Sequence, residues 1–431
     1  MTIDGRVGTA VHLAIGLGVL GAAGYAFVAV VGHVFGDPAD AGVLSALISL
    51  YLLVNIIGPG IFAALEQETS RAVSAATARG EPLRPIARRA GLLALCSFGA
   101  LVVLVLGAWP LVLSRVLDAR PGMLVALIVA IAGSGAVYWA RGLLGGQQRF
   151  PAYARTLYVE GAARLLPCLL LLVLALRWPT GYAMAFAVGS AVAALSVAPG
   201  LRLAPAATVP APVEGMARSL SYLVVATSLS QLVANLAPVV VTYRSPDDLV
   251  TAGVFGSTFV LARIPLFLFA PVQAVLLPKL TRAATLGHHQ TLERRLRQAV
   301  ALVFAVGAIG VVGCVWLGPW AAEALFNTAY RPSATVLGLL GAATLVMMTV
   351  LVVQPTLVAL GRQRLVTLGW IAGSIVFLAL LVLMPEPVGA ALCAQLVGPL
   401  VVLGVLVVGV VRALRQLGFG SAPASPSGRR R

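Results

Sequence analysis

One arginine, Arg263, lies deep in a long apolar run, and Pro265 follows it closely. If that run is a helix over 253–277, ten residues at ~1.5 Å each place the guanidinium about 15 Å deep, near the middle of a membrane. A charge at that depth is costly and usually functional, and a guanidinium can hold two phosphate oxygens together. We therefore predict that Arg263 binds an anionic group and that Pro265 bends the helix. The alternative is a structural tie to carbonyls or to a carboxylate.

A second pair of charges, Glu160 and Arg164, lies four residues apart in a predicted helix over 157–176. Residues at this spacing share a helix face, so an ion pair within the helix is the simplest interpretation. This helix would place both residues one to two turns inside its cytoplasmic end. The functional alternative is that Arg164 lines the inner mouth of a substrate site, while Glu160 tunes it or carries a proton.

Amide side chains also fall within the predicted spans, several of them near prolines that break helices. They are Asn55 (near Pro59), Gln231 and Asn235 (near Pro238), and Gln273. Amides in a wet cavity can bind sugar hydroxyls, but they more often tie neighbouring helices together. Both interpretations stay open at this point.

The elements that would position these residues are transmembrane helices. The chain is 60% hydrophobic and only 10% charged, whereas a soluble protein carries roughly 25% charged residues. Its apolar runs repeatedly exceed the ~18 residues needed to span a bilayer, without the alternation of a β-barrel. We predict an all-α integral membrane protein whose twelve helices lie near 8–35, 41–65, 90–116, 122–144, 157–176, 181–202, 219–242, 253–277, 299–320, 333–360, 366–384 and 389–411.

The formal charge of +16 reflects membrane topology and not a nucleic-acid surface. Most of the 30 Lys and Arg fall on one side when the N-terminus is placed in the cytoplasm, which is the positive-inside pattern. This predicts a multi-pass protein of the cell membrane with both termini cytoplasmic. The basic loops would contact anionic membrane lipids.

Short internal repeats divide the chain into two halves. Ala41-Gly42-Val43 recurs as Ala252-Gly253-Val254, and Ser70-Arg71-Ala72 as Thr281-Arg282-Ala283. Because each half would hold six helices, both halves enter the membrane in the same direction, as in parallel transporter repeats. We predict a six-helix bundle over 1–202, a linker over 203–218, a second bundle over 219–412, and a disordered tail over 413–431.

Nothing in the sequence indicates an enzyme. A Walker A motif is absent, and the acidic residues are scattered. The four cysteines lie in apolar runs without metal-ligand spacing, so they are interpreted as packing residues. No cofactor and no metal site are predicted.

Four short segments, in order and spacing, resemble polysaccharide-biosynthesis membrane proteins. They are Gly142-Leu143-Leu144-Gly145-Gly146-Gln147-Gln148-Arg149-Phe150, Arg263-Ile264-Pro265-Leu266 with Val275-Leu276-Leu277-Pro278-Lys279-Leu280, Ala329-Tyr330-Arg331-Pro332-Ser333, and Ala359-Leu360-Gly361-Arg362-Gln363-Arg364. The chain thereby resembles the multidrug/oligosaccharidyl-lipid/polysaccharide flippase superfamily. The resemblance implies two six-helix bundles in a V around a central cavity, and a polysaccharide branch that flips polyprenyl-pyrophosphate-linked oligosaccharides. The membrane-embedded acid often found in the first helix of the multidrug branch is absent between Arg6 and Asp37.

We therefore expect a flippase that moves a polyprenyl-(pyro)phosphate-linked oligosaccharide by alternating access. Its partners would be that lipid, anionic membrane lipids and glycan-assembly proteins. The alternatives are a multidrug or small-metabolite exporter of the same fold, and a membrane scaffold that transports nothing. A site for cationic drugs should carry acids, whereas the midplane charge here is Arg263.

Overall fold

The computed structural model describes residues 3–201, 216–266, 289–327, 331–360 and 362–419. These residues form helices joined by short connections and no strand, which confirms the predicted all-α class. Eleven segments in the described part of the chain are long and apolar enough to cross a membrane. The fold is therefore that of a multi-pass membrane protein.

The helices before residue 201 form one group. They are α1 (Ile3–Phe35), α2 (Ala41–Ile57), the π-helical turn η2 (Gly58–Phe62), α3 (Ala63–Arg79), α4 (Arg84–Gly107), α5 (Trp109–Leu111), the π-helical turn η3 (Val112–Val116), α6 (Pro121–Gly146), α7 (Phe150–Val173) and α8 (Pro179–Val197). We call them the N-terminal half. The end at which α1 begins is called the inner end, following the predicted topology, and the end at which it finishes is called the outer end.

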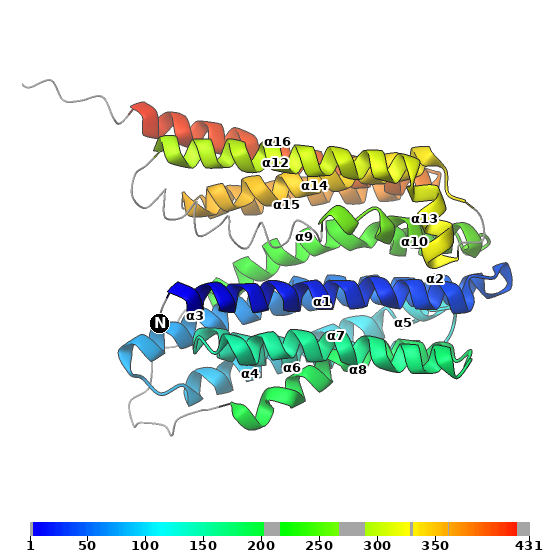
Figure 1. The fold of residues 1–431 in the computed structure, drawn as a ribbon, viewed down its shortest axis with the longest axis horizontal. Coiled ribbons are helices and arrows are strands. Elements are labelled where there is room, and N and C mark those ends of the chain that lie inside the picture. Colours follow the sequence, from blue (N-terminus) through cyan, green and yellow to red (C-terminus); the bar gives the residue numbers. More distant parts are fainter. Residues whose placement is uncertain (1–2, 202–215, 267–288, 328–330, 361, 420–431) are drawn as a thin grey trace, which may run out of the picture.

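The second group follows residue 215 and is called the C-terminal half. Its described helices are α9 (Met216–Arg244), α10 (Leu249–Leu261), α12 (His289–Trp316), α13 (Gly318–Phe326), α14 (Ala334–Ala359), α15 (Gln363–Leu383) and α16 (Pro387–Phe419). In Figure 1, α12 and α14–α16 lie together on one side and α1–α8 on the other, with α9 and α10 between them. These two central helices therefore carry much of the contact between the halves.

Local sequence signals account for many helix ends. Prolines occupy the first turns of α6, α7 and α8, where the missing N–H costs nothing. Gly80 ends α3 in a left-handed conformation with φ of 69°, which only glycine adopts without strain. Helix α3 therefore continues the second predicted span well beyond residue 65.

The predicted start of the disordered tail, at residue 413, comes too early in the sequence. Helix α16 continues to Phe419, past the predicted end of the second bundle at 412. Ala413 is buried, and Leu414 packs against the core, so the helix gains contacts that composition alone does not reveal. Of the predicted linker, residues 203–215 lie outside the described part of the chain, and α9 begins at Met216.

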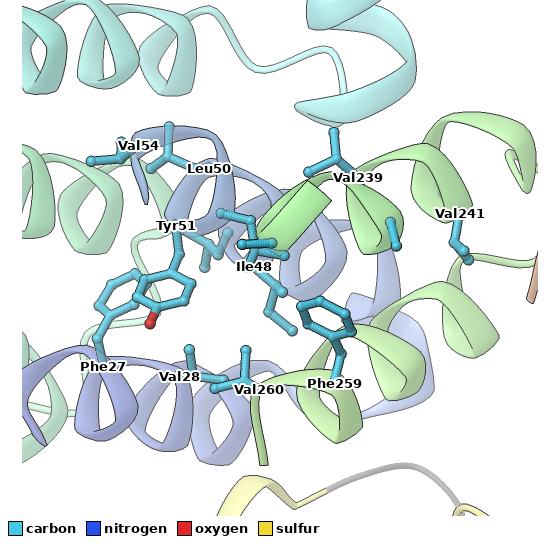
Figure 2. Packing of buried hydrophobic residues seen from close by; sticks show 14 of the residues in the cluster. Phe27, Val28, Ile48, Leu50, Tyr51, Val54, Val239, Val241, Phe259 and Val260 are labelled. Atoms are coloured by element: carbon cyan, nitrogen blue, oxygen red, sulfur yellow. The ribbon is translucent and has the colours of Figure 1, made fainter. Parts of the chain in front are cut away.

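The largest buried cluster crosses from one half to the other. Figure 2 shows Phe27 and Tyr51, from α1 and α2, beside residues of the C-terminal half that include Val239 and Phe259. By contrast, Val103 on α4 is 72% exposed within the protein, as a side chain facing lipid tails should be. Because lipid is as apolar as these side chains, close packing and hydrogen bonds must hold the halves together.

At the outer end, α1 meets α13 by direct contact between backbones. A Cβ atom added at Gly32 would overlap the carbonyl oxygen of Phe326, and one added at Gly36 would overlap that of Asn327. Glycine lets two backbones approach closely enough to pack in this way. The two halves therefore touch at the outer end along α1.

Replacing Gly32 with alanine is expected to destabilise the protein by ~1–3 kcal/mol, because the added methyl must push α13 away. The measurement is the midpoint of thermal unfolding of the purified protein. Gly18→Ala is the matched control, since Gly18 lies on the same helix and its Cβ position has nothing within 4 Å. Equal midpoints for the two variants would show that α1 and α13 are not held in this contact.

Candidate functional site

Arg263 lies where the helix of the C-terminal half is interrupted. Helix α10 ends at Leu261, Ala262 and Arg263 form a turn, and the chain is helical again at Ile264 and Pro265. The predicted bend is thus present as a break in the helix. The Arg263 residue is 9% exposed. Its guanidinium carbon lies 4.2 Å from the centre of the Phe259 ring, one turn earlier, which is within the range of a cation–π contact.

Two of the predicted amides lie beside this arginine. Arg263 Nη1 donates a hydrogen bond to Asn235 Oδ1 at 3.3 Å. Asn235 Nδ2 in turn donates to the side-chain oxygen of Gln231 at 3.2 Å and to its carbonyl oxygen at 3.1 Å. The fold therefore brings Arg263, Asn235 and Gln231 together, and α9 supplies both amides.

The charge of Arg263 has no carboxylate counterpart in the described part of the chain. No Asp or Glu there forms an ion pair with it, although the phenols of Tyr25 and Tyr51 lie within electrostatic reach. A guanidinium offers five N–H donors, and the Asn235 contact uses one of them. A nearly buried cation without a paired anion is costly, so this position favours an anionic ligand.

Glu160 and Arg164 belong to a different buried cluster, within the N-terminal half. Arg164 Nη2 lies 2.5 Å from Glu160 Oε1, and Arg141 Nη2 lies 2.5 Å from Glu160 Oε2. Ser190 on α8 donates to Glu160 Oε1 at 2.6 Å. Each carboxylate oxygen thus faces a guanidinium. We call Arg141, Glu160, Arg164 and Ser190 the Glu160 network.

The position predicted for this pair within its helix is wrong. Helix α7 begins at Phe150 and not near 157, so Glu160 lies about 15 Å and Arg164 about 21 Å from its inner end, at ~1.5 Å per residue. Both residues are therefore deep within the protein. The pairing across α6, α7 and α8 favours the structural interpretation, because a carboxylate held by two arginines and a serine is poorly placed to release and take up protons.

Sequence reasoning missed Arg141, which is only 3% exposed. It lies inside the predicted helix 122–144, so an arginine in an apolar run was an available signal. Arg141 Nε also donates to Thr156 Oγ1 at 2.8 Å. Nearby, Tyr153 donates from its hydroxyl to Glu66 Oε1 at 2.6 Å, which links α7 to α3.

The two remaining predicted residues are placed as follows. Asn55 Nδ2 donates to the carbonyl oxygen of Tyr51 in its own helix at 2.8 Å, so its amide is engaged with the backbone just before the π-helical turn. Gln273 lies outside the described residues. In the described part of the chain, no three His, Cys, Asp or Glu residues are arranged to hold a metal ion.

A cavity of about 440 Å³ lies at the outer end, where connections from both halves meet. Asp118 and Asp248 contribute to its lining, and both are engaged, Asp118 with Arg120 at 2.8 Å and Asp248 with the N–H of Thr251 at 3.0 Å. This cavity is separate from Arg263. Their engagement assigns Asp118 and Asp248 to loop structure at the junction of the halves.

The sequence has relatives among mycobacterial proteins. It is 28% identical over 362 residues to an uncharacterised protein of Mycobacterium tuberculosis, covering 81% of this chain and 80% of the relative, and it matches one of Mycobacterium bovis equally. A second uncharacterised Mycobacterium tuberculosis protein is 25% identical over 294 residues, or 66% of each chain. No protein-family profile matches the chain.

Solved structures define the class of fold. An inward-facing multidrug resistance MATE family transporter of the MOP superfamily superposes with a TM-score of 0.71 at 14% identity, covering 96% of this chain and 99% of the other. An outward-facing transporter of the same family gives 0.62 at 12% identity, covering 95% and 96%. A MOP superfamily transporter from Pyrococcus furiosus, described as having a binding pocket of reverse polarity that suggests a different function, gives 0.63 at 14% identity, covering 95% of both chains.

The chain therefore has the fold of these MATE family transporters. The two MATE transporters and the Pyrococcus furiosus transporter are described as members of the MOP superfamily. Membership of this chain in that superfamily, and in its polysaccharide branch, stays a prediction.

Proposed function

We propose that this protein is a flippase that moves a polyprenyl-(pyro)phosphate-linked oligosaccharide from the inner to the outer leaflet by alternating access. The observation that carries the proposal is Arg263, a nearly buried guanidinium without a paired carboxylate in the described part of the chain, near the contact between the halves. A bidentate contact to a phosphate would supply the missing negative charge.

The sign of this charge supports an anionic substrate over a cationic one. A site for organic cations requires carboxylates, whereas the buried carboxylate of Glu160 is already engaged by two arginines. The Pyrococcus furiosus transporter provides a precedent for this fold with a binding pocket of reversed polarity and a different function. Similarity of fold to multidrug transporters is therefore compatible with an anionic substrate for this protein.

The neighbours of Arg263 suit a phosphate joined to sugars. Asn235 and Gln231 present amide groups beside the guanidinium, and amides hydrogen-bond to hydroxyl groups. Phe259 supports the guanidinium from one face and keeps the phosphate on the other. In this arrangement the headgroup enters between the halves while the polyprenyl tail stays in the lipid.

The conformation corresponds to the start of such a cycle. The TM-score is higher against the inward-facing transporter, at 0.71, than against the outward-facing one, at 0.62. The contacts of Gly32 and Gly36 with α13 keep the halves together at the outer end. We infer that the chain is in an inward-facing state, ready to take substrate from the inner leaflet.

A multidrug or small-metabolite exporter is the second candidate, favoured by the multidrug transporters among the structural neighbours. The two candidates differ in what accumulates when the protein is lost. Loss of the flippase should strand lipid-linked oligosaccharide at the inner leaflet, whereas loss of an exporter should leave those lipids unchanged and raise sensitivity to its substrate.

The test is the amount and sidedness of polyprenyl-linked oligosaccharide in cells depleted of the protein. We expect accumulation on the cytoplasmic face, relieved by the wild-type chain and not by Arg263→Ala at equal protein level. Arg297→Ala is the matched control, because Arg297 pairs with Glu293 on an exposed helix face and should not affect transport. Unchanged lipid pools on depletion would overturn the flippase proposal in favour of export of another solute or of a scaffold.

A further inference from the structure

The second span of the N-terminal half contains a π-helical turn, η2, where it meets the other half. Its sequence is Gly58-Pro59-Gly60-Ile61-Phe62, between α2 and α3. Pro59 has no N–H to continue the α-helical ladder, and a wider turn is one way to accommodate it. A backbone carbonyl at such a turn can accept a further hydrogen bond, and inside a membrane the partner must come from the protein.

The carbonyl of Gly60 finds that partner in the C-terminal half. Both Thr227 Oγ1 and Ser228 Oγ, on consecutive positions of α9, donate hydrogen bonds to it, the latter at 3.2 Å. Gly60 also permits this approach, since a Cβ placed there would lie 3.3 Å from Ser228 Cα. A single backbone oxygen thus accepts two hydroxyl donors from the other half.

The contacts nearer the outer end are of a different kind. Ser45 and Thr242 hydroxyls lie 2.9 Å apart between α2 and α9, and Gly256 on α10 packs against Ile48 on α2. These contacts join side chains, whereas the Gly60 contact joins hydroxyls to a backbone carbonyl. The Thr242 hydroxyl also donates to the carbonyl oxygen of Pro238 in its own helix at 3.1 Å.

We propose that η2 and the hydroxyl pair Thr227–Ser228 form a pivot that stays in contact while the outer ends of the two halves separate. Two adjacent hydroxyls allow the Gly60 carbonyl to keep one donor as α9 rotates, so movement need not leave it unsatisfied. The outer contacts join hydroxyl and apolar side chains, and the hydroxyls can exchange their partners for water when the outer ends open to solvent. This inference rests on the proposed alternating access, but not on the identity of the substrate.

The test compares two engineered disulfides in a chain whose exposed Cys96 and Cys393 are replaced by serine. Gly60→Cys/Ser228→Cys locks the pivot, and Ser45→Cys/Thr242→Cys locks the outer contact. Spin labels at Ala39 and Asp247, exposed residues on the outer connections of the two halves, report the outer distance in lipid nanodiscs. This readout needs no substrate.

The unlocked protein should show both short and long outer distances. The pivot disulfide should leave the long-distance population in place, and the outer disulfide should abolish it. Loss of that population in both cross-linked proteins would overturn the pivot. If Gly60→Cys/Ser228→Cys does not fold or does not cross-link, Thr227→Val/Ser228→Ala replaces it.

That hydroxyl-free variant should broaden the outer distance distribution, because the Gly60 carbonyl then has no hydroxyl donor from α9 in either state and the halves are no longer held at one point. An unchanged distribution would overturn the pivot. The two proposals can fail separately. If the spin labels show the expected outer movement but depleted cells keep unchanged pools of lipid-linked oligosaccharide, the flippase function is refuted and the pivot is not.

Discussion

Replacing Glu160 with alanine is expected to destabilise the protein by about 3–5 kcal/mol, more than most single substitutions. The change leaves Arg141 and Arg164 facing each other in the protein interior without the carboxylate between them. Both guanidiniums would be nearly buried, and neither can reach bulk water without unpacking α6 or α8. The cost is therefore that of two uncompensated charges, together with the hydrogen bond from Ser190.

The measurement is the thermal unfolding midpoint in detergent, with the yield of correctly inserted protein. Glu323→Ala is the control, since the pair between Glu323 and Arg331 is largely exposed and such pairs contribute only ~0–1 kcal/mol. Glu160→Ala with Arg164→Leu should recover part of the loss, because it removes one of the stranded charges. Comparable midpoints for Glu160→Ala and the wild type would show that the network contributes little to folding.

The overall architecture could largely be predicted from the sequence, because the lipid bilayer strongly limits which backbone structures can cross it. Apolar runs of spanning length admit only helices where the backbone must satisfy its own hydrogen bonds, and the all-α class follows. Arg263 was accessible for a related reason. A lone charge in an apolar run stands out in a one-dimensional pattern, and Pro265 beside it marks the break in the helix.

The Glu160 network could not be predicted from the sequence in the same way. The first turns of α7 are polar, with Tyr153, Arg155 and Thr156, so the apolar pattern indicated a later start and placed Glu160 too close to the inner end. Its second arginine, Arg141, comes from another helix. Periodicity places residues on the face of one helix, but it does not say which faces of different helices meet.

The π-helical turn illustrates the same limit. Pro59 signals that the helix is irregular, but the form of the irregularity depends on a partner. Here the partner is α9, whose Thr227 and Ser228 donate hydrogen bonds to the carbonyl of Gly60. That contact joins residues far apart in the sequence. A single sequence without related sequences beside it contains no signal for such pairing.

Replacing Arg263 with methionine should have the opposite effect on stability from replacing Glu160, while abolishing transport. Methionine fills a similar volume beside Phe259, and it removes a charge that has no paired carboxylate in the described part of the chain. Replacing a whole buried ion pair with packed apolar groups is often neutral or stabilising by ~1–4 kcal/mol, and the substitution at Arg263 strands no oppositely charged partner among the described residues. We therefore expect an unfolding midpoint equal to or above that of the wild type, with export of the lipid-linked oligosaccharide lost.

Arg263→Lys separates charge from geometry in the same experiment. Lysine keeps the positive charge but not the planar pair of donors that fits a phosphate, so export should fall between the wild-type and methionine levels. If Arg263→Met instead lowered the midpoint as far as Glu160→Ala does, Arg263 would be a structural tie. A stable, inactive methionine variant would instead mean that the protein retains a destabilising charge for its function, which is the stability–activity trade-off expected of a binding site.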